Sequence, residues 1–185
     1  GGGLLAILSI GKVKIYNNTF YNNRAKNGGG ALIILEEDSA EVYVVNNIFW
    51  QNTAIAGGRD GDDLFINSNY DEQGRSSAIN LYNNNFSGNA NFSSGKSEDL
   101  LITKVQQGRY NHAGNVQVDP RFVNASAGDF RLQANSPLID KGYNNLPSEL
   151  LQKDKDGNPR VVGGAVDIGA YEFQGRGGGS STDGL

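Results

Sequence analysis

Short apolar runs alternate along this chain with turns rich in asparagine and glycine. Three segments share the pattern aliphatic-x-Asn-Asn-x-Phe-x-x-Asn, at residues 15–23, 44–52 and 81–89. A second kind of apolar run also recurs, at residues 4–8, 31–35, 64–66 and 100–102. When these runs are aligned on Leu5, Leu32, Leu64 and Leu100, they are 27, 32 and 36 residues apart. Such spacings lie in the range of solenoid repeats.

Each repeat contains two strand-like runs and no helical periodicity, so it buries an apolar face only by stacking on its neighbours. Stacking places equivalent residues in interior columns: Val13 with Val42 and Ile79, Ile15 with Val44 and Leu81, and Phe20 with Phe49 and Phe86. Alternate side chains then face solvent, among them Lys12, Lys14, Glu41 and Tyr43. We expect the repeated Asn18, Asn47 and Asn84 to lie at a tight corner and to form a hydrogen-bonded ladder there. The predicted fold is all-β, a right-handed single-stranded parallel β-helix with a C-terminal cap.

The composition agrees with this fold and excludes several others. The 185 residues include 26 Gly and 23 Asn, which helices tolerate poorly and turns accept. A helix bundle is excluded, and no apolar run approaches the ~20 residues of a membrane span. The net charge of −4 provides no basic surface for nucleic acid. The absence of Cys excludes disulfides, thiolate zinc sites and thiol nucleophiles, and it is compatible with an extracellular protein.

Two sets of motifs carry a resemblance to known families. The Phe-x-x-Asn repeats, with Gly-Gly-Ala-Leu at 29–32, are similar to repeats of polymorphic outer-membrane adhesins and of the pectate-lyase-like superfamily. A more specific series resembles the C-terminal module of bacterial choice-of-anchor Q domain proteins. Its members follow in order as DPRF at 119–122, GDFRL at 128–132, SPLIDKG at 136–142, DGNPR at 156–160 and DIGAYE at 167–172. The resemblance implies a secreted β-helix that ends in a cap and leads into an anchoring tail.

The chain is therefore divided into β-helix coils at 1–118, a cap module at 119–173 and a flexible Gly/Ser linker at 174–185 toward a missing anchor. It starts at Gly1 without an initiator Met, so we interpret it as the C-terminal portion of a longer solenoid. Because a terminal coil exposes unpaired backbone groups and an apolar cross-section, both ends need a cover. Residues 120–173 are expected to cover the C-terminal end. Upstream coils, or a second copy stacked end to end, are expected on the N-terminal end, over Leu5 and Ile7.

Carboxylates provide one candidate metal site. Asp60, Asp62 and Asp63 lie together in a Gly-rich turn, and Ca²⁺ prefers such oxygen ligands. The alternative is a solvated turn in which these carboxylates cap backbone amides. The Asp-Lys-Asp-Gly-Asn segment at 154–158 has its Gly too early for a calcium loop, which favours a tight turn. His112, the only histidine, is assigned to a loop, and one His without Cys assembles neither a catalytic triad nor a His-pair metal site.

Aromatic side chains provide a candidate binding surface. The register turns several of them outward or toward a corner, where flat rings bind sugar rings or a partner protein. The candidate ligand-contact residues are Tyr16, Tyr43, Trp50 and Tyr82, with Tyr21 at a comparable position. The alternative is that several of these rings pack beneath loops.

Two functions remain open from the sequence. The favoured one is a non-catalytic secreted or cell-surface β-helix that acts as a stalk, adhesin, matrix or filament element, with cell-surface polysaccharide as a candidate partner. The other is the C-terminal part of a polysaccharide lyase or glycoside hydrolase whose active coils lie upstream of Gly1. A polygalacturonase-like site needs a Gly-His-Gly turn, which this chain lacks. Fold alone does not choose between them.

Overall fold

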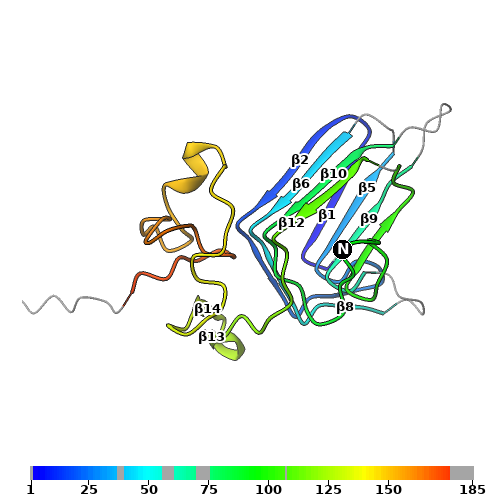
Figure 1. The fold of residues 1–185 in the computed structure, drawn as a ribbon. Coiled ribbons are helices and arrows are strands. Elements are labelled where there is room, and N and C mark those ends of the chain that lie inside the picture. Colours follow the sequence, from blue (N-terminus) through cyan, green and yellow to red (C-terminus); the bar gives the residue numbers. More distant parts are fainter. Residues whose placement is uncertain (1, 37–39, 56–60, 70–75, 107, 176–185) are drawn as a thin grey trace, which may run out of the picture.

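The computed structural model describes residues 2–36, 40–55, 61–69, 76–106 and 108–175. Two four-stranded parallel sheets face each other across one core (Figure 1). One sheet has the order β1 (Leu4–Leu8), β5 (Ala31–Leu35), β9 (Leu64–Asn67) and β11 (Leu100–Thr103). The other has the order β2 (Gly11–Tyr16), β6 (Ala40–Val45), β10 (Ala78–Tyr82) and β12 (Tyr110–Ala113). The chain therefore winds as a parallel β-solenoid of about three turns, and the fold predicted from the repeats is confirmed.

Short strands form a third side of the solenoid. They pair in parallel as β3 (Thr19–Tyr21) with β7 (Ile48–Trp50) and β4 (Arg24–Ala25) with β8 (Thr53–Ala54). After the last layer, β13 (Phe122–Asn124) and β14 (Asp129–Leu132) form an antiparallel hairpin around the 3₁₀ turn η1 (Ala125–Ala127). A second 3₁₀ turn, η2 (Ser148–Leu151), follows. No helix in the described ranges is long and apolar enough to cross a membrane.

The predicted interior columns are confirmed by the register. Val13 pairs with Val42 and Val42 with Ile79, while the neighbouring column joins Ile15, Val44 and Leu81. The three phenylalanines stack as rings: Phe20 and Phe49 have centroids 4.8 Å apart, and Phe49 and Phe86 have centroids 5.1 Å apart. Both spacings are close to the ~4.8 Å between neighbouring strands. Outside the core, an ion pair joins Lys12 to Glu41 at 2.9 Å.

In the alignment of the first sheet, Leu5 pairs with Leu32 and Leu64 with Leu100 as predicted, but the step from Leu32 to Leu64 was wrong by one residue, since Leu32 pairs with Phe65. The register joins Leu4 to Ala31, Ala31 to Leu64 and Leu64 to Leu100, so the middle repeat is 33 residues long. Leu5 therefore faces outward and is 56% exposed, whereas Leu64 is fully buried. Because side chains alternate along a strand, a one-residue slip moves every side chain to the other face.

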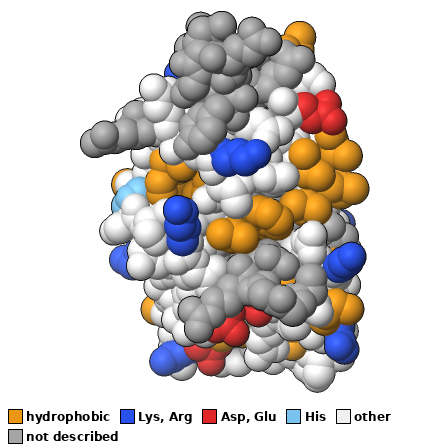
Figure 2. Space-filling model, turned by 90° about the vertical axis from the view of Figure 1, so that its right-hand side faces the viewer, with side chains coloured by type: hydrophobic (Ala, Val, Ile, Leu, Met, Phe, Trp, Pro, Cys, Tyr) orange, Lys and Arg blue, Asp and Glu red, His pale blue; other side chains and the backbone are white. Residues whose placement is uncertain are grey.

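The outer face of this first sheet is apolar. Leu5 and Ile7 are both more than half exposed, and the next strand adds half-buried Leu32 and Ile34. Figure 2 shows hydrophobic side chains gathered across this face. Leu5 and Ile7 thus lie on a side of the solenoid and not across its N-terminal end, where the repeat spacing had placed them.

Asparagine ladders run through the corner between the second sheet and β3/β7. The backbone N–H groups of Asn18, Asn47 and Asn84 each donate to the Oδ1 of the next asparagine in the stack, at 2.9, 3.0 and 3.0 Å, and the ladder ends at Asn115. The side-chain amide of each also donates to the same oxygen. The ladder predicted from the repeats is therefore confirmed and extends one layer further.

The first asparagine of each pair has a different role. Asn17, Asn46 and Asn83 have positive φ angles of 55°, 58° and 50°, which turn the chain at the corner. Their side chains point away from the core and bond to a later segment. Asn46 is clamped on both sides, since its Nδ2 donates to the carbonyl of Tyr143 and its Oδ1 accepts the N–H of Tyr143.

Residues 119–173, which we call the flank segment or the flank, pack along one side of the solenoid (Figure 1). Asn83 of the third layer donates to the carbonyl of Lys141, and Asn17 of the first layer donates to the carbonyl of Leu150. The segment therefore runs back along the stack, against the direction of winding. Three of its buried side chains, Leu132, Leu138 and Ile168, form a second core together with Ile48 of the solenoid. The boundaries 1–118, 119–173 and 174–185 stay predictions, and most of the expected linker lies outside the described residues.

Aromatic rings, and not the flank segment, lie at the C-terminal end of the first core. Tyr110 continues the column of Ile79, and His112 continues that of Leu81. Their rings are 5.1 Å apart, and Phe92 packs on the same core. The expectation of a cover made by residues 120–173 is therefore corrected, because the corner asparagines bind that segment to the side. The assignment of His112 to a loop was also wrong, since it lies in β12.

Candidate functional site: a groove between the solenoid and the flank

Two aromatic rings stand side by side on the outer face of β3 and β7. In these strands Phe20 and Phe49 point into the core, so the following residues, Tyr21 and Trp50, point outward. The parallel register pairs Tyr21 directly with Trp50. Both side chains are half-buried. The repeat that stacks the phenylalanines inside thus also aligns two flat rings outside.

The β13–β14 hairpin forms the opposite wall. The Tyr21 ring meets Phe122 edge-on at 5.9 Å and Phe130 at 5.2 Å, and these two phenylalanines contact each other at 5.4 Å. This aromatic contact fixes the hairpin against the first layer of the solenoid. It leaves an open groove of about 410 Å³ between the two, within the ~300–1,000 Å³ range of small-ligand pockets.

Polar side chains surround the rings in this groove. Gln51 follows Trp50, while Arg121, Gln133 and Asn135 project from the flank. Arg121 is held in place, because its Nη1 donates to the carbonyl of Asn135 at 2.9 Å. The side-chain amides of Gln51 and Asn135 are exposed and make no hydrogen bond within the described residues. The groove therefore combines an aromatic floor with free donors and acceptors.

Comparison with protein families gives a match that includes most of the solenoid and much of the flank segment. A family model described as "Domain of unknown function (DUF5123)" matches residues 13–160, which extend from β2 into the flank segment. The chain belongs to the DUF5123 family. Searches found no similar curated protein and no similar solved structure. The match does not confirm the resemblance to choice-of-anchor Q domain proteins.

The four aromatic residues singled out in the sequence occupy different environments in this DUF5123 chain. Trp50 lines the groove, and Tyr16 lines a separate pocket beside η2. Tyr82 stacks on Tyr143 of the flank with centroids 5.7 Å apart, which matches the alternative of packing beneath a later segment. The Tyr43 hydroxyl donates to Glu41 at 2.9 Å. The structure therefore brings Trp50 together with Tyr21 and does not join all four.

The acidic turn has structural hydrogen bonds. Asp62 accepts the N–H of Ala54, and buried Asp63 accepts from the Asn52 amide and the Ser87 N–H. Burial raises the pKa of Asp63 to about 7, against the lowering effect of these donors. In the part of the chain that the structure describes, no group of three His, Asp or Glu residues is arranged to hold a metal ion. Asp60 lies outside the described residues, so the calcium site formed with it stays a prediction.

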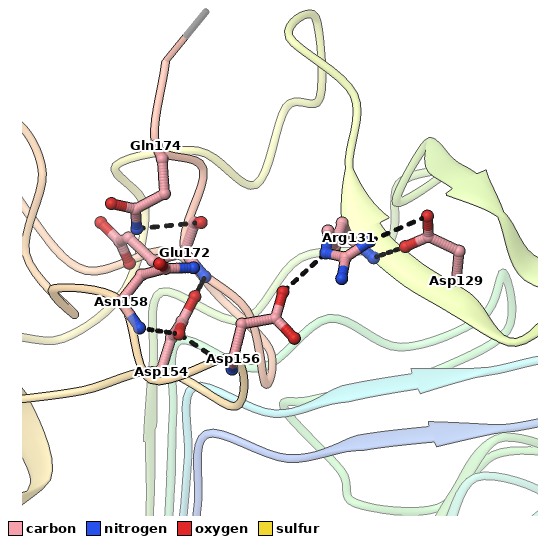
Figure 3. Close-up of polar contacts among 7 residues, drawn as sticks. All are labelled: Asp129, Arg131, Asp154, Asp156, Asn158, Glu172 and Gln174. Atoms are coloured by element: carbon pink, nitrogen blue, oxygen red, sulfur yellow. Dashed lines mark hydrogen bonds and ion pairs between the residues drawn. The ribbon is translucent and has the colours of Figure 1, made fainter. Parts of the chain in front are cut away.

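The 154–158 segment is a tight turn held by its own first residue. Asp154 Oδ1 accepts the N–H groups of Asp156 and Asn158, and Oδ2 accepts the N–H of Glu172 (Figure 3). Arg131 joins this turn to the β13–β14 hairpin through an ion pair with Asp156 at 2.6 Å. The carboxylate of Asp154 is therefore committed to backbone donors.

The groove residues contributed by the flank were not predicted from the sequence. Arg121 has a positive φ of 55° and sits next to Phe122, but nothing in its local pattern indicates a position opposite Trp50. The signal that was present is the first asparagine of each repeated pair. This asparagine turns the corner with a positive φ, and its outward-pointing side chain binds the flank segment.

Proposed function

We propose that this protein is a non-catalytic secreted or cell-surface β-solenoid that binds a neutral saccharide chain in the groove. The observation that carries the proposal is the Trp50–Tyr21 pair beside the free amides of Gln51 and Asn135. The apolar face of a sugar ring stacks on an aromatic ring, while its hydroxyl groups need both donors and acceptors. A side-chain amide supplies both.

The charges in the groove support a neutral ligand. Asp119 and Arg121 are the charged residues that line it, one of each sign. The Asp119 carboxylate accepts the backbone N–H of Arg121, and the guanidinium donates to a carbonyl. The formal charges of the lining therefore sum to zero, and the groove has no excess of either sign.

The extracellular location and the surface role rest on the resemblance to choice-of-anchor Q domain proteins and on the absence of Cys. A stalk, adhesin or matrix element needs a rigid rod with an exposed binding face, and a solenoid provides one. The proposed partner is a cell-surface polysaccharide. For the enzyme alternative, the described acids Asp62 and Asp63 offer no support, since they accept structural hydrogen bonds.

The single tryptophan of the chain makes the proposal directly testable. Trp50 reports on the groove by its own fluorescence, so a saccharide that stacks on it changes the emission. A glycan array identifies candidate saccharides, and fluorescence titration then measures affinity. Trp50→Phe should retain most binding on the array, whereas Trp50→Ala should weaken it by about 10-fold or more, the ~1.4 kcal/mol or more expected for a central aromatic contact.

Tyr43→Ala provides a matched control, because Tyr43 is an aromatic residue outside the groove. It should bind like the parent protein. The proposal is rejected if no saccharide on the array binds the parent protein, or if Tyr43→Ala and Trp50→Ala weaken binding equally.

A further inference from the structure

A buried arginine in the flank segment has hydrogen-bond donors without acceptors. The Arg160 side chain is 1% exposed. Its Nη2 donates to the carbonyls of Asp167 and Gly169. Its Nε and Nη1 are buried and have no hydrogen-bond partner. Because a buried donor without a partner is energetically unfavourable, such a group points to a missing acceptor.

Nearby carboxylates do not supply that acceptor. Asp154, Asp167 and Glu172 favour the charged guanidinium electrostatically, against the burial that lowers the pKa of Arg160. The carboxylate oxygens of all three already accept backbone N–H groups. In the described part of the chain, Arg160 makes no ion pair with them. Its charge is thus balanced at a distance, while two of its nitrogens remain unpaired.

A buried acceptor without a donor lies in the same place. The Oδ1 of Asn17 is buried and has no partner. At the equivalent corner of the next layer, the Oδ1 of Asn46 accepts the N–H of Tyr143. Asn17 therefore has the geometry of this corner series but lacks the flank donor that completes it.

Both residues line one pocket between the first corner and η2. Its volume is about 280 Å³, several times the ~30 Å³ that one water molecule occupies in the liquid. Lys153 and Lys155 add two further cations to its lining, and Tyr16 contributes an aromatic ring. The acids that line it are Glu149 and Asp154, of which Asp154 is committed to the 154–158 turn.

We propose that this pocket, which is separate from the groove, binds a small oxyanion that also carries a hydroxyl group. The oxyanion accepts from Arg160 and is attracted by Lys153 and Lys155, while the hydroxyl donates to Asn17 Oδ1. A sugar acid combines both features in one small molecule.

Three probes separate the parts of this proposal. D-glucuronate carries a carboxylate and hydroxyl groups, sulfate is an oxyanion without a hydroxyl, and D-glucose has hydroxyl groups without a charge. Calorimetric titration should rank glucuronate above sulfate and show no glucose binding at this pocket. The NMR signal of the Arg160 Nε–H should shift on glucuronate addition.

The variants avoid replacing the buried arginine, which the fold needs. Lys153→Ala combined with Lys155→Ala should weaken glucuronate and sulfate by about 10-fold or more. Asn17→Gly keeps a residue that tolerates positive φ and should weaken glucuronate but not sulfate. Lys96→Ala, an exposed lysine outside the pocket, should leave both affinities unchanged.

The proposal is overturned if glucuronate leaves the Arg160 signal in place, or if glucose binds as tightly as glucuronate. If Trp50→Ala abolishes glucuronate binding and the lysine variants do not, the sugar acid binds in the groove. That result would also reject the pocket as its binding site. A pocket that holds only ordered water would give no titration with any of the three probes, and that result would reject the proposal as well.

Discussion

At the scale of the residue, the repeated Asn-Asn dipeptide divides two tasks between neighbours. The second asparagine joins the ladder inside the corner, where Asn47 is fully buried and bonds to Asn84. The first takes the left-handed conformation and holds the flank, as Asn46 does with Tyr143. Asparagine suits both positions, because it tolerates positive φ and its amide both donates and accepts.

Replacing Phe49 by Ala should destabilise the fold by about 3–5 kcal/mol. Phe49 is fully buried between Phe20 and Phe86, so truncation leaves a cavity in the middle of the ring stack. Urea unfolding measures the change. Tyr43→Ala, at an outward position, should cost much less; a loss below about 1 kcal/mol for Phe49→Ala would contradict the interior register.

The free energy of unfolding should decrease as pH rises from 5 to 8. The folded pKa of Asp63 is about 7, well above the ~4 of an unfolded Asp, so the native state holds this proton more tightly. The associated stability is fully present below pH ~4 and is lost as pH rises through 7, on the order of 4 kcal/mol. Glu172, whose pKa burial also raises to about 7, acts in the same direction.

Urea unfolding at pH 5 and pH 8 tests this, with Asp63→Asn as the variant. The Asn side chain places an NH₂ group against a neighbouring donor, so a loss of stability at both pH values is expected. The informative quantity is the difference between them, which should shrink in the variant. An unchanged difference would remove Asp63 from the pH dependence.

At the scale of the element, the flank segment depends on the corner residues that precede it in the chain. Three asparagines in successive layers hold backbone groups of Lys141, Tyr143 and Leu150. The N–H of Gly169 also donates to the carbonyl of Asn46 at 2.8 Å. The flank segment, which has few regular strands, is thus held in place by side chains of the regular solenoid. It forms one wall of the groove.

Asn46→Gly should loosen the flank while preserving the solenoid. Glycine keeps the positive φ without strain, but the two hydrogen bonds to Tyr143 are lost, at about 1 kcal/mol or more each in a buried site. Hydrogen exchange should accelerate at Tyr143 and Gly142 and remain slow in β6. Equal acceleration in β6 would mean that the corner, and not the clamp, has been disrupted.

At the scale of the whole molecule, the two ends of the solenoid differ. The last layer ends its core columns with the rings of Tyr110 and His112, and the His112 ring is exposed, as expected of a terminal repeat that meets solvent. The first layer has Val13 and Ile15 in these two columns, and its residues Leu4, Leu8 and Val13 are only partly buried. Strands β1 and β2 pair on one side only, as β11 and β12 do at the other end. We propose that a further coil or a second copy of the chain covers this end.

The isolated chain should therefore self-associate through its first layer. Sedimentation velocity at micromolar concentrations should show species larger than the monomer. A charge placed inward at this end, Val13→Lys, should reduce association, whereas Val161→Lys, at an exposed position on the flank, should not. A stable monomer of the parent protein at these concentrations would contradict the proposal.

The sequence by itself determined the solenoid, its core columns and its asparagine ladder. These features repeat along the chain, and stacking converts sequence repetition directly into contact, as in the Phe20–Phe49–Phe86 column. The first sheet was misaligned by one residue between Leu32 and Leu64, because its runs are continuously apolar and its outer face is apolar too. Without an alternation between polar and apolar residues, no local pattern fixes which side chain points inward.

Only the tertiary structure decided where residues 119–173 lie and what they form with the solenoid. Their packing depends on contacts between positions about 100 residues apart, such as Asn46 with Tyr143, and these contacts occur once each. Non-repeating contacts leave no periodic signal in a single sequence. For the same reason, neither the groove at Trp50 nor the unpaired nitrogens of Arg160 could be read from the chain before it was folded.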